Sequence, residues 1–262
     1  MDYKGMAALV TGASTGLGEE FARQLASRGC NLILVARSED KLKSLALALQ
    51  RSWKTEVAVM PADLASADAV QRLITEIKRR GTNVSLLVNN AGFGIFDNFL
   101  DAPLQRQMEQ VDVNVRSLVT LTHAFAPSMV TARRGGVINI ASNAAFQPLA
   151  GADVYAASKA FVLFFSEALS LELEKNNVRV LAACPGPVAT QFFANMNPKM
   201  EAKQMDQPAT IVREILRAFE KGKKVVVPGK LLVRLGTLGA RLLPRNTIAR
   251  LAAGTVQQLN RK

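Results

Sequence analysis

Tyr155 and Lys159 carry the first pattern in this sequence that can do chemistry. They lie four positions apart, so on a helix their side chains share one face. A free tyrosine hydroxyl has a pKa of about 10, too high for ready proton exchange at neutral pH, and a neighbouring ammonium favours the phenolate and lowers that pKa. Ser142, at the end of a predicted strand, is placed to bind a substrate oxygen. The same Tyr–Lys pair also arises by chance, with the tyrosine tip and the lysine reaching water.

A glycine-rich loop, Thr11 to Gly18 (TGASTGLG), is the second chemical pattern. It follows an apolar run and opens onto a helical pattern. Glycines let the backbone approach a pyrophosphate, and a helix N-terminus offers free N–H donors and a favourable dipole. A plain glycine turn is the alternative, and the strand before and the helix after the loop favour the phosphate site.

Arg37 stands at the end of the second apolar run, where folds that bind NAD place an acid for the ribose 2′-hydroxyl. The first acid here is Glu39. A guanidinium matches a 2′-phosphate in forked geometry, so Arg37 together with the glycine loop favours NADP(H). In isolation, Arg37 is also compatible with a solvated arginine at the start of a helix.

The elements that must position these residues are short apolar runs alternating with amphipathic segments. Near-continuous runs of Val, Leu, Ile and Ala are typical of strands covered on both faces. Strand–helix alternation therefore predicts one α/β domain, with a doubly wound parallel sheet of about seven strands and helices on both faces. The predicted strands are 6–11, 31–36, 56–61, 84–89, 136–141, 178–184 and 224–227, and the predicted helices are 17–28, 39–52, 66–79, 104–130, 155–175 and 209–220.

Composition excludes several classes of protein. With 262 residues, 49% of them hydrophobic, the chain can bury a full core. The distant Cys30 and Cys184 and the single histidine, His123, exclude a disulfide framework, a zinc site and a Ser-His-Asp triad, so we expect no metal. No run approaches the roughly 18 apolar residues of a membrane span, and the N-terminal apolar run lacks the features of a signal peptide. We expect a cytoplasmic protein.

The net charge of +12 is concentrated in the C-terminal tail. Residues 1–220 carry 23 basic and 21 acidic side chains, whereas residues 221–262 carry ten Lys or Arg and no Asp or Glu. Because the body of the protein is nearly neutral, we expect no nucleic-acid partner despite the high pI.

In their order along the chain, these motifs resemble the classical branch of the short-chain dehydrogenase/reductase family. The resemblance spans residues 5–228. It rests on TGASTGLG at 11–18, Asp63-Leu64, NNAG at 89–92, Asn114, Ser142, YAASK at 155–159 and PGPVAT at 185–190. It implies a Rossmann-type fold and an NADP(H)-dependent oxidoreductase that reduces a carbonyl to an alcohol by hydride transfer, with Tyr155 as the proton donor.

The resemblance also implies which residues contact the cofactor. They are Gly12, Ser14, Thr15, Gly16, Leu17, Gly18, Arg37, Asp63, Leu64, Asn90, Ala91, Gly92, Tyr155, Lys159, Pro185, Gly186, Val188 and Thr190. The glycine loop would hold the phosphates, with Ser14 and Arg37 near the 2′-phosphate. Asp63 and Leu64 would flank the adenine, and Asn90 would steady the ribose side. Val188 and Thr190 would meet the nicotinamide carboxamide.

The implied catalytic residues are Asn114, Ser142, Tyr155 and Lys159. Tyr155 would be the general acid in reduction, and Lys159 would lower its pKa while holding the nicotinamide ribose. Ser142 would polarise the carbonyl, and Asn114 would hold a water in the proton relay. One alternative is a non-catalytic NADP-sensing protein, which would not need Tyr155 and Lys159. Another is an epimerase or dehydratase of the extended branch, whose usual spacing is TGxxGxxG in a longer chain.

The predicted substrate pocket is apolar. Phe192, Phe193 and Met196 follow PGPVAT, in a segment that the resemblance makes a mobile lid, and Phe93 and Phe96 follow NNAG. With Ser142, they predict an adaptable pocket for an apolar ketone or acyl-type substrate. The alternative is that these side chains simply pack the lid down.

Two further surfaces predict partners. Helix 155–175 contains Phe161 to Phe165 in an apolar run and has no polar face, so we expect it to meet a second subunit in a homodimer or homotetramer. Beyond a catalytic domain of residues 1–228, we expect a basic amphipathic extension, residues 229–262, packed on the same domain. Lys230, Arg234 and Arg241 form its basic stripe at helical spacing. Contact with an anionic membrane surface or an acidic partner is the alternative.

Overall fold

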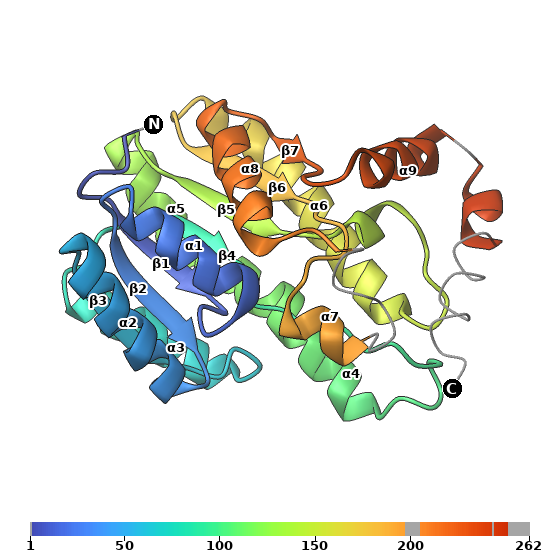
Figure 1. The fold of residues 1–262 in the computed structure, drawn as a ribbon, viewed down its shortest axis with the longest axis horizontal. Helices are drawn as coiled ribbons and strands as arrows, with labels where there is room; N and C mark the ends of the chain where they lie inside the picture. Colours follow the sequence, from blue (N-terminus) through green and yellow to red (C-terminus); the bar gives the residue numbers. More distant parts are fainter. Residues whose placement is uncertain (1, 197–204, 243, 251–262) are drawn as a thin grey trace.

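The computed structural model describes residues 2–196, 205–242 and 244–250 of the protein (Figure 1). Within these residues, seven parallel strands form one sheet in the order β3-β2-β1-β4-β5-β6-β7. The strands are β1 (Ala7–Thr11), β2 (Asn31–Ala36), β3 (Val57–Pro61), β4 (Val84–Asn89), β5 (Gly136–Ile140), β6 (Arg179–Ala183) and β7 (Val225–Val226). This architecture confirms the predicted doubly wound parallel sheet.

The direction of strand addition reverses at β1. The chain lays β2 and β3 on one side of β1, then returns to place β4 on its other side and continues outward to β7. At such a point the loops that follow the two neighbouring strands diverge and leave a crevice at the carboxyl end of the sheet. Those loops are the glycine loop after β1 and the NNAG turn after β4, so the topology brings the two motifs together.

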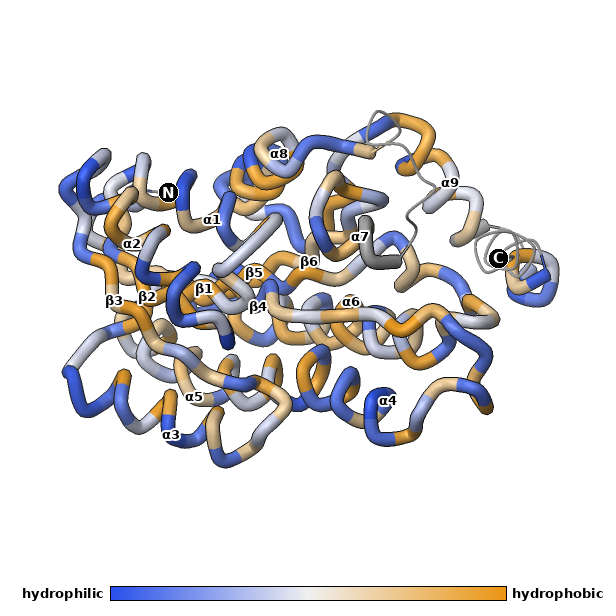
Figure 2. Tube along the Cα trace, turned by 60° about the horizontal axis from the view of Figure 1, so that its bottom comes forward, coloured by the Kyte–Doolittle hydropathy of each residue, from blue (hydrophilic) through white to orange (hydrophobic). Residues whose placement is uncertain are grey.

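Helices cover both faces of the sheet because side chains alternate along each strand. Ala8 and Val10 of β1 join the apolar core shared with α1, α2 and α8, whereas Leu9 joins the core shared with α3 and α5. Figure 2 shows the orange strands crossing the molecule between these two helical layers. The helices are α1 (Gly16–Ala26), α2 (Glu39–Trp53), α3 (Ala67–Arg79), α4 (Leu104–Val111), α5 (Ser117–Ala132), α6 (Asp153–Glu174), α7 (Gln191–Met196), α8 (Pro208–Glu220) and α9 (Leu231–Leu242).

The predicted helix 104–130 changes its winding in the middle. A π-helical turn, η1 (Asp112–Arg116), joins α4 to α5. A π turn closes i→i+5 hydrogen bonds instead of i→i+4 bonds, and such turns are frequent at functional sites. Since η1 contains Asn114, the change of winding falls on a predicted catalytic residue.

Two short helices were not predicted. The 3-10 helix η2 (Asn143–Phe146) follows Ser142, whose Oγ accepts a hydrogen bond from the Ala144 N–H at 3.1 Å and so caps the helix. The second is α7, which follows the PGPVAT motif. The side chain of Met196, a predicted pocket residue, lies outside the described residues.

Among the described residues, one helix, α6, has the length and mean hydropathy (1.4) of a membrane span. It nevertheless packs in the core, because Val162 and Leu163 join Ala182 of β6 in one apolar cluster. Its outer face exposes Phe161 and Phe164, which are 43% and 67% accessible. The predicted subunit contact through this helix stays a prediction.

The predicted extension, residues 229–262, contains α9, which packs on the domain through Val233. A Cβ placed on Gly186 would lie 2.9 Å from Val233 Cγ1, so the helix rests on the PGPVAT turn. The predicted boundary between 228 and 229 stays a prediction, and residues 243 and 251–262 lie outside the described residues.

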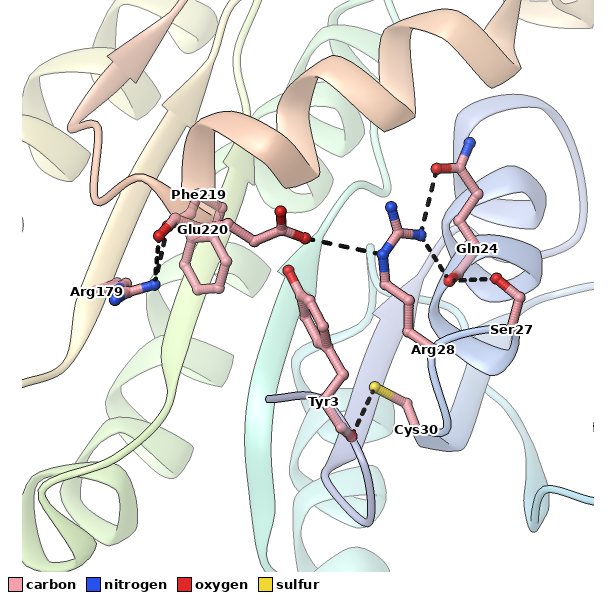
Figure 3. A network of polar contacts seen from close by, with 8 residues as sticks. All are labelled: Tyr3, Gln24, Ser27, Arg28, Cys30, Arg179, Phe219 and Glu220. Atoms are coloured by element: carbon pink, nitrogen blue, oxygen red, sulfur yellow. Dashed lines mark hydrogen bonds and ion pairs between the residues drawn. The ribbon is translucent and has the colours of Figure 1, made fainter. Parts of the chain in front are cut away.

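A polar cluster lies at the amino ends of the strands, opposite the motifs named above (Figure 3). Arg179 Nη1 donates a hydrogen bond to the Glu220 carbonyl at 2.8 Å, and Arg28 Nε lies 3.8 Å from the Glu220 carboxylate. The Tyr3 ring lies under the Arg28 guanidinium, 5.9 Å from its centroid, and Cys30 Sγ contacts the Tyr3 carbonyl at 3.5 Å. The cluster therefore joins the N-terminal segment to α1, β6 and α8.

Candidate functional site

A cleft of about 1010 Å³ opens at the carboxyl ends of the strands. Its lining includes most of the predicted site residues: Gly12, Ser14, Thr15, Gly16, Leu17, Arg37, Asp63, Leu64, Asn90, Ala91, Gly92, Phe93, Phe96, Ser142, Tyr155, Lys159, Pro185, Gly186, Val188, Thr190, Phe192 and Phe193. The structure thus brings together motifs that lie up to 180 residues apart in the sequence. Of the predicted residues whose side chains the structure describes, Gly18 and Asn114 are not among the lining residues.

The glycine loop presents an uncapped helix N-terminus to this cleft. Thr15 is the N-cap of α1, and no side chain caps the helix there, so its first N–H groups are available to a ligand. Gly12 has a φ of +66°, and an added Cβ would lie 2.8 Å from Asn90 Nδ2. An open cradle of N–H donors at a positive helix end fits a phosphate.

Gly18 packs against the glycine loop. A Cβ at this position would lie 2.1 Å from the Gly12 carbonyl oxygen and 2.5 Å from Asn90 Nδ2. Gly18 therefore allows α1 to pack closely against the glycine loop, and it does not face the cleft. Its predicted contact with the cofactor stays a prediction.

Thr11 holds the glycine loop and the NNAG turn together, a role that sequence reasoning missed. Its hydroxyl donates to the Val88 carbonyl at 3.2 Å and accepts from the N–H groups of Asn90 and Ala91 at 2.9 and 3.0 Å. Asn90 Nδ2 in turn donates to the Thr11 carbonyl at 2.9 Å. The position of Thr11, at the last residue of β1 and buried, is the signal that could have identified it.

The cleft extends from the glycine loop past the ends of β2 and β3. Arg37 is exposed at its edge, and within the described residues no carboxylate forms an ion pair with it. Asp63 lines the same region, where its carboxylate accepts the Ala65 N–H at 3.0 Å. Ser38, Ala62 and Ser66 also line this part and were not predicted.

Tyr155 lies at the floor of the cleft, 5% exposed. Its ring packs between Phe96 and Phe192, with centroid distances of 5.4 and 6.1 Å. Burial raises the pKa of Tyr155 to about 12, and a hydrogen bond with the Ser142 side chain acts in the opposite direction. The hydroxyl is therefore fully protonated at neutral pH.

Lys159 does not lower the pKa of Tyr155 in this structure, which corrects the expectation from the sequence. Its Nζ donates to the Ile140 carbonyl at 2.8 Å and lies 5.9 Å from the centroid of the Tyr155 ring. Burial lowers the pKa of Lys159 itself to about 8. The main physical cause at both residues is desolvation by burial, which disfavours the charged form of each group.

Asn114 is buried behind the cleft, where the π turn directs its amide toward two other segments. Its Nδ2 donates to the Phe93 carbonyl and to Ser158 Oγ, each at 3.0 Å, and its Oδ1 accepts the Phe93 N–H at 3.1 Å. Ser158 Oγ donates to the Tyr155 carbonyl at 2.7 Å. The Asn114 side chain thus tethers the NNAG turn to the helix of Tyr155, and its role with a water stays a prediction.

The mouth of the cleft carries charged side chains that sequence reasoning missed. Gln105, Arg106 and Glu109 of α4 line it. The Arg106 guanidinium lies over the Phe93 ring, 5.0 Å from the centroid, and forms an ion pair with Glu109. Because these residues have the regular spacing of an exposed helix face, the sequence did not indicate that they line a cleft.

Asp206 connects the PGPVAT turn to the start of the tail. Its backbone N–H donates to the Pro187 carbonyl at 3.0 Å, and its carbonyl accepts the Ala189 N–H at 2.9 Å. Its carboxylate accepts the Lys230 N–H at 3.2 Å. The loop that lines the cleft and the start of α9 are therefore held by the same residue.

The profile of the short chain dehydrogenase family matches residues 6–201 of this chain. Sulfoacetaldehyde reductase 2 of Chromohalobacter salexigens is 37% identical over 70% of this chain and 73% of its own length. The very-long-chain 3-oxoacyl-CoA reductase of Bos taurus is 31% identical over 81% of this chain and 68% of its own length. Among solved structures, a short-chain dehydrogenase from Sphingobium yanoikuyae in complex with NADPH has a TM-score of 0.81 at 30% identity and covers 90% of this chain and 93% of its own. The fold, the cleft and these similarities agree: this chain belongs to the short-chain dehydrogenase family of oxidoreductases.

Proposed function

We propose that this protein uses NADP(H) to reduce an apolar ketone or acyl-type carbonyl compound to an alcohol. The observation that carries the proposal is the position of Tyr155, protonated and buried at the floor of a cleft that begins at an uncapped helix N-terminus. When bound, the cofactor supplies the hydride for the carbonyl carbon. Tyr155 supplies the proton for the carbonyl oxygen.

Three side chains prepare this proton transfer. Ser142 shares a hydrogen bond with Tyr155 and orients the substrate oxygen toward it. Lys159, whose pKa of about 8 leaves it mostly charged at pH 7, places an ammonium on the same helix face as Tyr155. Its bond to the Ile140 carbonyl fixes the ammonium beside Gly92, where it can also hold a ribose hydroxyl. Asn114 holds α6 in position through its hydrogen bond to Ser158. It also supports the proton relay that reprotonates Tyr155 after each reduction.

Arg37 and Ser14 select the cofactor in this proposal. Both line the cleft, Ser14 in the glycine loop and Arg37 after β2, and Arg37 offers a guanidinium that no carboxylate among the described residues neutralises. A 2′-phosphate would gain charge-assisted hydrogen bonds there, whereas a 2′-hydroxyl would not. The complex of the Sphingobium yanoikuyae relative with NADPH supports this choice.

The substrate class follows from the side chains around Tyr155. Ala144, Ala152 and Tyr155 form an apolar cluster with Phe96, Leu149 and Phe192. These side chains favour an apolar group next to the carbonyl, and the activity named for the Bos taurus relative, a 3-oxoacyl-CoA reductase, supports an acyl-type substrate.

A homodimer or homotetramer is part of the proposal. Phe161, Phe164 and Leu171 of α6 are 43%, 67% and 63% exposed, so one helix presents a row of large apolar side chains to solvent. A second subunit would cover this row.

A cofactor-exchange experiment tests the function. Purified protein is assayed for loss of NADPH absorbance with ketones, aldehydes and 3-oxoacyl thioesters, and the assay is repeated with NADH. We expect kcat/KM to be at least about tenfold higher with NADPH, because a paired guanidinium contributes about 1.5–3 kcal/mol. Turnover of none of these carbonyl compounds would contradict the proposed activity.

Two arginine variants, one just before α2 and one in its last turn, make this test specific for Arg37. Arg37→Asp should erode or reverse the preference for NADPH. Arg51→Asp, at an exposed arginine in the last turn of α2, should leave it unchanged. Equal use of both cofactors by the unmodified protein would exclude Arg37 as the selecting residue.

A further inference from the structure

Helix α9 exposes an apolar face that the domain leaves uncovered. Leu231, Leu232, Leu235 and Leu238 are 68%, 81%, 55% and 53% exposed. Three of them, at i, i+4 and i+7, form one stripe along the helix. The opposite face holds the helix in place, since Val233 rests on Gly186 and Thr237 is buried. The leucine face is therefore turned outward by a helix that is anchored on its other side.

Basic side chains border this leucine face. Lys230, the residue before α9, lies one turn from Arg234 of α9, and Arg245 and Arg250 are exposed just beyond the helix. Arg234 Nη2 lies 2.6 Å from the Glu214 carboxylate of α8. The sequence from residue 221 to 262 contains ten basic residues and no acid. The surface around the leucines thus attracts a partner that is both apolar and anionic.

The leucine face lies at the end of the molecule where the cleft opens. In Figures 1 and 2, α9 and the segment that leads into α4 lie at the same end, with α7 between them. That segment exposes Phe99 and Leu100, which are 55% and 91% accessible. It also carries Asp97 and Asp101, so its charge is less suited to an anionic partner than that of α9.

We propose that the leucine face of α9 docks this protein on an anionic lipid bilayer, with the mouth of the cleft beside the lipid. A basic amphipathic helix binds such a surface through buried apolar area and attraction to anionic headgroups. A second copy of this chain fits the face less well, because the two basic tails would meet without an acid from either. In the docked state, an apolar substrate passes between the membrane and the cleft without crossing water.

Vesicle sedimentation with the full chain tests this proposal. The protein is mixed with vesicles of phosphatidylcholine alone and with vesicles that also contain about 30% phosphatidylserine. We expect at least about tenfold stronger binding to the anionic vesicles, and loss of most of this binding at about 0.5 M salt. Protein that stays in the supernatant of the anionic vesicles at low salt would overturn the proposal.

A matched pair of variants tests the leucine face itself. Leu235 of α9 and Leu47 of α2 are both 55% exposed, but they lie on different helices at opposite ends of the molecule. Leu235→Asn should weaken binding to anionic vesicles several-fold, and Leu232→Asn with Leu235→Asn by about tenfold or more. Leu47→Asn should bind like the unmodified protein. Equal binding by Leu235→Asn and Leu47→Asn would overturn the proposal.

Two controls separate membrane docking from the proposed reaction and from dimer formation. Turnover of a small water-soluble ketone without vesicles should be the same in all variants, so a failure of the proposed reaction does not affect the binding result. Light scattering reports the oligomeric state. A dimer that Leu235→Asn converts to a monomer, together with absent vesicle binding, would show that a second copy covers this face and would overturn the proposal.

Discussion

The chain has two tyrosines, and they lie at opposite ends of the same sheet. Tyr3 belongs to the cluster at the amino ends of the strands, and Tyr155 lies at the carboxyl ends, in the cleft. Each is 5% exposed, and burial is the main cause that raises the pKa of each above its usual value. Burial and a raised pKa therefore do not distinguish a catalytic tyrosine from a structural one.

The neighbours of the two hydroxyls make the difference. Tyr3 faces the Glu220 carboxylate, which opposes formation of a phenolate and raises the pKa further. Tyr155 has the Ser142 hydroxyl as a partner, which acts in the opposite direction, and the Lys159 ammonium on the same helix face. Only Tyr155 lines the cleft. A cation lies 5.9 Å from the centroid of each ring, Arg28 at Tyr3 and Lys159 at Tyr155, so the cleft and the Ser142 hydroxyl are what distinguish Tyr155.

The largest effect is expected from Tyr155→Phe, with Tyr3→Phe at the other end of the sheet as its control. Tyr155→Phe should lower kcat/KM for carbonyl reduction by about 10³-fold, since it removes the proposed general acid and little else. Binding of NADPH, measured by fluorescence titration, should persist. Tyr3→Phe should change kcat/KM less than about twofold, because Tyr3 does not reach the cleft. An active Tyr155→Phe variant would show that another group donates the proton.

A smaller effect is expected in the pH dependence of stability. The folded-state pKa of Lys159 is about 8, below its ordinary value of 10.5, so between these values the unfolded chain binds a proton that the folded protein does not. The free energy of unfolding should therefore rise with pH in this window. The contribution of Lys159 should amount to about 2 kcal/mol between pH 7.5 and 9.5.

Urea unfolding of the unmodified protein and of Lys159→Met measures this contribution. Groups that titrate elsewhere in the molecule affect both proteins alike, so the difference between the two curves isolates Lys159. Parallel curves across pH 7.5 to 9.5 would show that the ammonium is less desolvated than its burial indicates.

The smallest effect is expected at the other end of the sheet. Glu220→Gln removes the carboxylate that faces Tyr3 and pairs with Arg28 at 3.8 Å, but both side chains of that pair are about a third exposed. The free energy of unfolding should change by less than about 1 kcal/mol, and kcat/KM should not change. A loss of more than about 2 kcal/mol would show that this cluster holds the N-terminal segment to α8 more firmly than its distances suggest.

Sequence patterns predicted the two tyrosine environments unequally. The apolar runs marked the seven strands because both faces of the sheet are covered, and the motif order placed Tyr155 at their carboxyl ends. The cluster around Tyr3 left no pattern, because Arg28, Arg179 and Glu220 come from three elements and meet only after packing. Residues that come together only in the folded structure leave no periodic pattern in the sequence.

Some roles within the site were also beyond sequence reasoning. The π turn at 112–116 depends on hydrogen-bond register, which a helical apolar pattern does not reveal. Thr11 and Gly18 act by contacts with the NNAG turn, so their roles follow only from the distance between two loops. The pKa values of Tyr155 and Lys159 depend on desolvation, which is a property of the packed site and not of the spacing between two residues.

The contact of Val233 with Gly186 has a thermodynamic consequence. Gly186 lines the cleft, and Asp206 joins the same turn to the start of α9. A ligand that orders this turn therefore also favours the seated position of the helix, and linkage requires the effect to be mutual. If nucleotide binding strengthens the contact of α9 with the domain by some factor, then a surface that holds α9 in that position raises the affinity for the nucleotide by the same factor.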